Sequence, residues 1–162
     1  EVAACTDLPV LQKDFLTNAA QLRTARDLGA SAVLLTAALL PRAALASLVD
    51  TSLSLGLTPF VEVTSEAEVA ALPACDETVV AVNNKDIRDR ERGAPDIGRS
   101  LRLLPAVRAT GTPCPVSASG IDGPDVAARL LDAGFAGLLV GTGLLRSDGL
   151  DAWCRALDGH RV

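Results

Sequence analysis

Short apolar runs recur along this chain, and a segment with helical spacing follows each of them. Runs in which successive residues are apolar indicate strands buried on both faces, because a half-buried strand would alternate with polar residues. On this pattern we predict strands over residues 8–15, 31–37, 58–64, 78–84, 114–120 and 135–141. Each predicted strand ends in polar or glycine residues.

The segments between these runs carry the boundary signals of helices. Asn18 is a side chain that caps helix N-termini, and Ser65 with Glu68 fits a capping box. Pro105 is expected to bend or end the helix in which it lies. We predict helices over residues 19–28, 41–55, 122–132, 143–146 and 151–157. For two further helices the sequence predicts one boundary each: one helix begins at residue 65, and another ends at about residue 109.

This strict alternation of strand and helix predicts an α/β fold with a parallel sheet. An open doubly wound sheet and a closed barrel both satisfy the rule. The barrel is favoured because polar residues recur at the C-terminal strand ends, where barrel enzymes place their sites. A complete barrel has eight strands in about 250 residues. We therefore predict that residues 1–162 form a single partial (β/α)8 domain, with the first two βα units missing.

The least regular segment covers residues 85–98. It is charged and contains Pro95 and two glycines, so we predict a surface loop. The loop is either a solvated connection, which is the favoured interpretation, or a mobile cover over the site.

Composition narrows the class of protein. Hydrophobic residues make up 49% of the chain but aromatic residues only 2%, so the core is expected to consist of Leu, Val and Ala. The net charge of −5 and the scarcity of aromatic side chains argue against binding to nucleic acid or an anionic membrane. No apolar run reaches the roughly 18 residues of a membrane span. The 4 cysteines and single histidine lack zinc-ligand spacing, so we expect reduced thiols, no metal and a cytoplasmic location.

Glycine-rich turns follow the last two predicted strands, at Ser119-Gly120 and at Gly141-Thr142-Gly143. Glycine lets backbone N–H groups approach an oxyanion closely, and the short helix after Gly143 adds its N-terminal end. The alternative is that these glycines only make tight turns. Two such turns on the last strands of a barrel pattern favour a phosphate site.

Two ionisable side chains suggest acid–base chemistry. Lys13 follows an apolar strand, so we expect its ammonium group to be partly desolvated and its proton more available. Glu62 lies among apolar strand residues, so its carboxylate must face a polar site or a partner. Across a barrel mouth the two would form an acid–base pair, and a structural ion pair at the rim is the alternative. Asn83 and Lys85 are candidates for contacting a substrate oxygen and an anionic group, whereas Ser119 has no histidine nearby to make it a nucleophile.

Six segments together resemble the indole-3-glycerol phosphate synthase family of tryptophan biosynthesis. They occur in the family's order and spacing along nearly the whole chain, and as a set they are specific. The segments are PVLQKDF (9–15), AVLLTAALL (32–40), LTPFVEV (57–63), VAVNNKDI (80–87), VSASGI (116–121) and GLLVGTGLL (137–145).

The resemblance implies an eight-stranded barrel lyase that needs no cofactor. Its reaction would close the indole ring of a phosphorylated carboxyphenylamino-deoxyribulose, with loss of carbon dioxide and water. Lys13 matches the family's general acid, which protonates the substrate carbonyl. Glu62 matches a catalytic carboxylate that assists proton transfer in the dehydration, and Asn83 and Ser119 match polar residues of the active site.

The resemblance also implies the binding residues. Phe15 and Lys85 are expected to contact the substrate, and Lys85 stands where the family often has arginine near the substrate carboxylate. The positions expected to bind phosphate are Gly120, Gly141, Thr142 and Gly143.

Two departures leave alternatives open. Ala118 stands where the family usually has an active-site glutamate, so a catalytically degenerate barrel that binds a phosphorylated ligand or a partner is one alternative. A paralogue that acts on a modified anthranilate substrate is another. The family's first strand carries a glutamate and a second lysine that this chain lacks, so we expect either that the sequence is a fragment of a longer protein or that another segment or chain supplies that quarter. Other enzymes of the tryptophan pathway are the further candidate partners.

Overall fold

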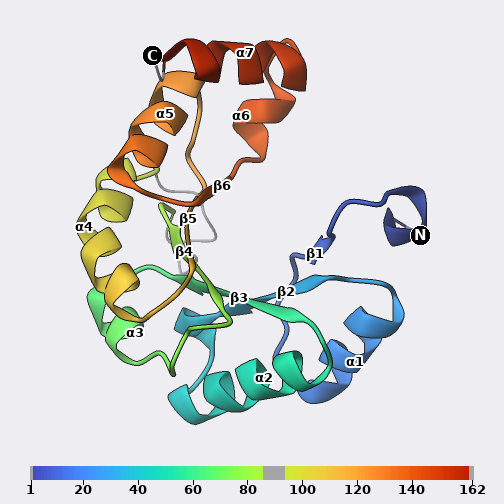
Figure 1. The fold of residues 1–162 in the computed structure, drawn as a ribbon. Coiled ribbons are helices and arrows are strands. Elements are labelled where there is room, and N and C mark those ends of the chain that lie inside the picture. Colours follow the sequence, from blue (N-terminus) through green and yellow to red (C-terminus); the bar gives the residue numbers. More distant parts are fainter. Residues whose placement is uncertain (1, 86–93, 161–162) are drawn as a thin grey trace.

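The structure is a computed structural model that describes residues 2–85 and 94–160, and its centre is one 6-stranded parallel sheet. The strands are β1 Leu11–Gln12, β2 Ala32–Thr36, β3 Thr58–Val63, β4 Val79–Asn83, β5 Cys114–Ala118 and β6 Gly137–Leu139. They lie in the sheet in chain order, and each pairs in parallel with the next. The sheet curls into an open half-barrel with β1 and β6 at its two ends (Figure 1). The predicted partial barrel is confirmed.

Helices α1 to α5 connect successive strands and cover the convex face of the half-barrel, and α6 and α7 follow the last strand (Figure 1). They are α1 Ala19–Asp27, α2 Arg42–Ser54, α3 Glu66–Ala70, α4 Ile97–Ala109, α5 Pro124–Ala133, α6 Thr142–Leu145 and α7 Leu150–His160. Short 3-10 turns occur at Val2–Cys5 and Ala37–Leu39. Among the described helices, none is long and apolar enough to cross a membrane.

The two edge strands are shorter than the sequence pattern predicts. The predicted strand over 8–15 narrows to β1, which pairs only with β2, and Pro9 has no N–H to donate to a ladder. The predicted strand over 135–141 narrows to β6, which pairs only with β5. An edge strand forms backbone hydrogen bonds with one neighbouring strand only. An apolar sequence by itself is therefore not enough to extend the pairing.

The helix boundaries follow the predicted signals with two differences. Asn18 forms a capping box with Gln21. Ser65 accepts a hydrogen bond from the Glu68 N–H, but the Glu68 carboxylate accepts from the N–H of Thr64 (2.6 Å) rather than from that of Ser65. Pro105 was expected to bend or end its helix, and it does not end it, because α4 continues to Ala109. Buried leucine and valine side chains on both sides of the proline hold that helix against the sheet.

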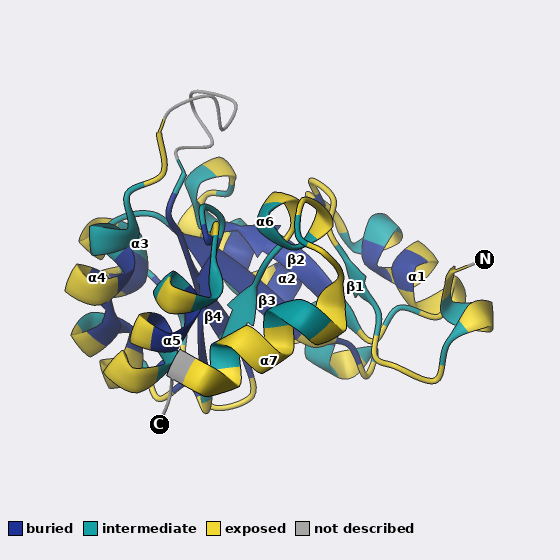
Figure 2. Cartoon of the chain, turned by 90° about the horizontal axis from the view of Figure 1, so that it is seen from above, coloured by how far each residue is buried: buried dark blue, intermediate teal, exposed yellow. Residues whose placement is uncertain are grey.

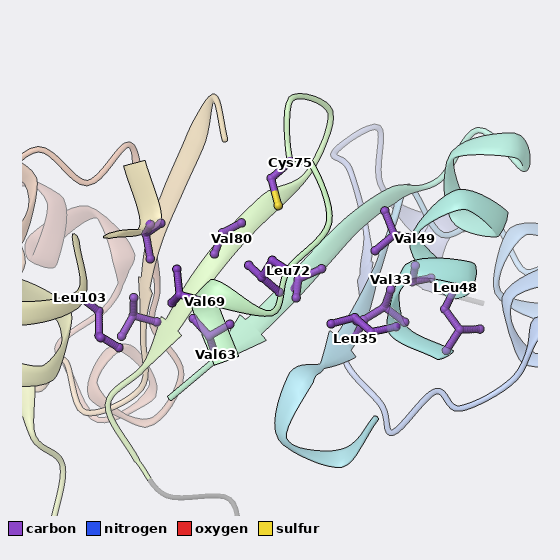
Figure 3. Close-up of a cluster of buried hydrophobic side chains, with 14 of the residues drawn as sticks. Val33, Leu35, Leu48, Val49, Val63, Val69, Leu72, Cys75, Val80 and Leu103 are labelled. Atoms are coloured by element: carbon purple, nitrogen blue, oxygen red, sulfur yellow. The ribbon is translucent and has the colours of Figure 1, made fainter. Parts of the chain in front are cut away.

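Buried apolar side chains form two separate clusters, one on each face of the sheet. The larger cluster fills the space between the strands and the outer helices, as Figure 3 shows for Val33, Leu35, Val63 and Val80 against their helical neighbours. The smaller cluster lies on the concave face and consists of Leu34, Phe60, Ala81, Val116 and Ala118. Seen from above, the strands form a buried band, and the exposed residues gather on the outer surfaces of the helices (Figure 2). Successive strand residues alternate between the two clusters, as the two-residue period of a strand requires.

A buried polar network joins β4, β5 and α4 on the helix-covered face. Asn84 is fully buried, and its side-chain amide donates to Ser117 Oγ (3.0 Å) and to the carbonyls of Ala118 and Ser119 (both 3.1 Å). Its Oδ1 accepts from Ser100 Oγ (2.8 Å), which in turn contacts Ser117 Oγ at 2.7 Å. This network fixes the C-terminal ends of two central strands against one helix.

We predict that Asn84→Ala lowers the free energy of unfolding by about 3 kcal/mol, because it leaves several buried hydrogen-bonding groups without partners. Urea denaturation followed by circular dichroism measures the change. Asn18→Ala is the matched control, since it removes an exposed helix cap and should cost about 1 kcal/mol. Equal losses in the two variants would contradict the structural role given to Asn84.

The hydrogen bonds of Asp96, at the start of α4, lead us to predict that the stability of the protein depends on pH. Its carboxylate accepts from Arg102 Nη2 at 2.6 Å and caps the N–H of Arg99, and the Arg102 hydrogen bond lowers the pKa of Asp96 below its ordinary value of 3.8. A lowered pKa in the folded state means that the stabilising contribution is complete above the ordinary value. The contribution is then lost as the pH falls through the folded value.

The variant Asp96→Asn keeps a good N-cap but removes the charge. We expect the wild type to lose stability more steeply than this variant as the pH falls from about 5 to about 3, where the carboxylate becomes protonated. Urea midpoints measured across that range provide the test. Parallel pH profiles for the two proteins would rule out the contribution from Asp96.

Candidate active site

The concave face brings several predicted site residues into register at the C-terminal ends of the strands. Thr36 pairs directly with Glu62, and Asn83 pairs directly with Ala118. All four share their face with the smaller apolar cluster, because they stand an even number of residues from its members on their own strands. The prediction that the strand ends meet on one face therefore holds for β2 to β5.

A cleft of about 550 Å³ opens over the ends of β5 and β6, and these four residues are not among those that line it. Seven of the predicted site residues line it: Lys13, Lys85, Ser119, Gly120, Gly141, Thr142 and Gly143. Arg146 and Asp122 also line it. Three cationic side chains therefore face this cleft with one carboxylate, which suits an anionic ligand.

Lys13 lies at the cleft, but its environment differs from the expected one. It follows the last residue of β1 and is exposed, so the prediction of a partly desolvated ammonium group is wrong. The reason is the short edge strand, which leaves the residues after Gln12 in an open loop. Within the part of the chain that the structure describes, Lys13 forms no ion pair, so the alternative of a structural bridge to Glu62 is not what this structure shows.

Glu62 and Asn83 lie deeper than the cleft residues. Glu62 is 2% exposed and Asn83 is fully buried, and neither lines the cleft. The Asn83 Oδ1 accepts from the N–H of Lys85 at 2.9 Å, which orients the amide group. The remaining Asn83 Nδ2 has no hydrogen-bond partner among the described residues. Both side chains are thus buried polar groups of the concave face, and Asn83 is bonded to the cleft residue Lys85.

The backbone around Lys85 is held by α4. Arg99 Nη1 donates to the carbonyls of Asn83 (2.8 Å) and Lys85 (3.1 Å), and the N–H of Asp96 donates to the carbonyl of Asn84 at 2.8 Å. These bonds place the Lys85 side chain at the cleft after β4 ends. The rest of the predicted loop over 85–98 lies largely outside the described residues, and its last two residues already belong to α4.

Two other predicted residues have contrasting positions. Ser119 has a positive φ of 66°, which is uncommon for a residue other than glycine, and it lines the cleft with its N–H bonded to the carbonyl of Leu139. Phe15 is 61% exposed and does not line the cleft. The loop after β1 therefore does not bring Phe15 to the site in this structure.

The glycine turns approach each other closely. A Cβ at Gly143 would collide with the carbonyl oxygen of Ile121, so only glycine lets the start of α6 lie against the loop after β5. Gly120 has a φ of +69° and packs against Pro95, which a side chain would also obstruct. The first N–H groups of α6 have no acceptor within the helix itself. The two turns together present backbone donors at one end of the cleft.

Sequence reasoning missed three features of this site. Arg146 directly follows α6, and its charge after a glycine turn was the available signal. Thr36 lies beside Glu62, and its polar side chain at the end of an apolar run was the available signal. Asn84 belongs to the buried network behind the site, and the two-residue period of a strand is the signal that places it and Asn83 on opposite faces.

Among the described residues, no group of three or more His, Cys, Asp or Glu side chains is placed to hold a metal ion. The four cysteines are free thiols, of which Cys75 is buried. Burial raises the pKa of Cys75, although a hydrogen bond involving Thr110 acts in the opposite direction. Cys75 lies in the outer cluster, away from the site.

Comparison with known proteins gives a consistent result. Residues 1–157 match the family described as indole-3-glycerol phosphate synthase. Relatives of that name from Chloroherpeton thalassium and Kineococcus radiotolerans are 40% and 37% identical, over 147 and 149 residues. These matches cover 91% of this chain but 55% and 52% of the relatives, so the chain spans about half of their length.

A solved structure, 3-hexulose-6-phosphate synthase from Salmonella typhimurium, is similar with a TM-score of 0.77. The similarity covers 99% of this chain and 78% of that chain at 14% sequence identity. At this level of identity the similarity shows the fold alone.

We predict that Gly143→Ala destabilises the protein by about 1–3 kcal/mol, because the new methyl group must displace backbone atoms of the loop after β5. Thermal unfolding followed by circular dichroism measures the effect. Gly141→Ala is the matched control in the same turn, since a Cβ there meets no atom within 4 Å. A Gly143→Ala protein as stable as Gly141→Ala would show that the close approach is not required.

Proposed function

The chain belongs to the indole-3-glycerol phosphate synthase family, and we propose that its protein closes an indole ring on a phosphorylated carboxyphenylamino-deoxyribulose. The observation that carries the proposal is the cleft in which Lys13, Lys85 and the glycine turns of β5 and β6 meet. Glu62 and Asn83 share the concave face of the sheet. This arrangement supplies cations for an anionic substrate and a carboxylate for proton transfer.

The proposed reaction begins with Lys13 as the general acid. Its ammonium group donates a proton to the substrate carbonyl while the ring carbon that bears the carboxylate attacks the carbonyl carbon. Carbon dioxide then leaves from that ring carbon and aromaticity returns. The former carbonyl oxygen, now a hydroxyl group, leaves as water, and Glu62 assists the proton transfers of this step. Positioned acids and bases of this kind contribute about 10²–10⁴-fold to a rate.

The phosphate group of the substrate is proposed to bind between the two glycine turns. Gly120, Gly141, Thr142 and Gly143 would supply backbone donors, with the nearby Arg146 adding charge. Lys85 is proposed to attract the substrate carboxylate, and Ser119 and Asn83 to hydrogen-bond the substrate. Phe15 would contact the substrate only after the loop that follows β1 changes its position. No cofactor takes part in this proposal.

The proposal extends to location and partners. The free thiols suit a cytoplasmic protein. The exposed edges of β1 and β6 would accept further strands, because a complete barrel has no edges. These strands would come from further residues of the same protein or from a partner, and other enzymes of tryptophan biosynthesis are the candidate partners.

A second candidate function is binding without catalysis, and Ala118 favours it. This residue is fully buried in the apolar concave cluster beside Asn83, at the position where the family usually has a glutamate. If Ala118→Glu created ring closure in a protein that otherwise only bound the substrate, the barrel would be a degenerate one. A third candidate, a paralogue that acts on a modified anthranilate, would show turnover only with the modified substrate.

We predict that Lys13→Ala and Glu62→Gln each lower kcat by about 10²–10⁴-fold, through loss of proton transfer. Turnover is followed by the fluorescence of the indole product. Arg23→Ala is the control, because it removes an exposed positive charge on α1, away from the cleft. A kcat for Lys13→Ala within about threefold of the wild type would contradict the role of Lys13 as the general acid.

A further inference from the structure

Two buried polar groups flank Glu62 on the concave face, and neither has a hydrogen-bond partner among the described residues. One is the hydroxyl group of Thr36, the last residue of β2, which is 4% exposed. The other is Nδ2 of Asn83 on β4, which lies two residues beyond Ala81, the register partner of Glu62. Thr36 and Glu62 are direct register partners, so their side chains stand next to each other.

The buried Thr36 hydroxyl group lowers the stability of the folded protein, because it has no described hydrogen-bond partner. A buried hydroxyl group without a partner loses the hydrogen bonds that it would make in water. Its surroundings are otherwise apolar, since Leu34 and Phe60 of the concave cluster precede Thr36 and Glu62 by two residues on their strands. Valine has almost the same shape and would avoid this cost. A ligand that supplies the missing partner would explain the polar side chain.

We propose that Thr36 is a substrate-contacting residue whose hydroxyl group hydrogen-bonds the substrate oxygen that is lost as water. This inference rests on the proposed function. In that reaction Glu62 assists the departure of this same oxygen, so the oxygen must lie near the Glu62 carboxylate. Thr36 is the adjacent side chain on β2, and Asn83 offers a second donor from β4. Three neighbouring strands would thus surround one substrate atom.

The alternative is that Thr36 only packs, through its methyl group. Two variants separate these roles. Thr36→Val keeps the branched shape and removes the hydroxyl group, whereas Thr36→Ser keeps the hydroxyl group and removes the methyl group. Thermal unfolding serves as a check, because Thr36→Val should be at least as stable as the wild type.

The test uses the complete natural protein and measures kcat and KM by product fluorescence. It also measures the Kd of a non-reactive analogue in which the substrate carbonyl is reduced to an alcohol. We expect Thr36→Val to lower kcat/KM about tenfold, the usual worth of one neutral hydrogen bond, and Thr36→Ser to recover most of that loss. A Thr36→Val enzyme as active as the wild type, with Thr36→Ser impaired, would overturn the proposal.

The analogue separates failure of this inference from failure of the proposed function. If the wild type binds the analogue without turning over the substrate, the ring-closing function fails and the Kd values decide the role of Thr36. Weaker analogue binding by Thr36→Val then supports the contact, and unchanged binding overturns it. A wild type that does not bind the analogue at all overturns both.

Discussion

The parallel register of the sheet is the constraint on which the rest of this structure depends. Because strand residues alternate between two faces, each polar residue at a strand end is assigned either to the concave side or to the helix-covered side. Thr36, Glu62 and Asn83 fall on the concave side, and Asn84 and Ser117 fall on the other. A shift of one residue in any strand would exchange these groups and place the network residues in the site.

The two faces use polar groups in opposite ways. On the helix-covered face, Asn84 has partners for both ends of its amide, and the resulting network joins two strands to α4. On the concave face, Thr36 and Asn83 each have a buried group without a described partner. Satisfied buried groups stabilise a fold, whereas unsatisfied ones lower its stability and suit a ligand that completes them. Asn83 and Asn84 are neighbours in the sequence but therefore have different structural roles.

The charged side chains of the candidate site differ in how deeply they are buried. The cations Lys13, Lys85 and Arg146 line the cleft, where they suit an anionic ligand. The carboxylate of Glu62 lies deeper, where it is nearly inaccessible to solvent. Ala118 leaves apolar surface beside Asn83, so in the proposed reaction proton transfer would depend more heavily on Glu62.

Sequence reasoning recovered the order of strands and helices, the parallel barrel architecture and most of the cleft residues. It could do so because buried parallel strands read as continuous apolar runs, and because the carboxyl ends of parallel strands must meet at one edge. It failed where a single partner decides the outcome, as at β1, whose pairing ends before Lys13 and leaves that side chain in solvent.

What only the tertiary structure decided is which polar side chains find partners. The sequence at Asn83-Asn84 and at Thr36 does not show which of these side chains form hydrogen bonds. The reason is that any partners must come from other strands or from α4. The close approach of Gly143 to Ile121 is likewise a contact between distant segments. Local sequence sets the period and the turns, whereas burial and partner geometry arise only when the strands pack together.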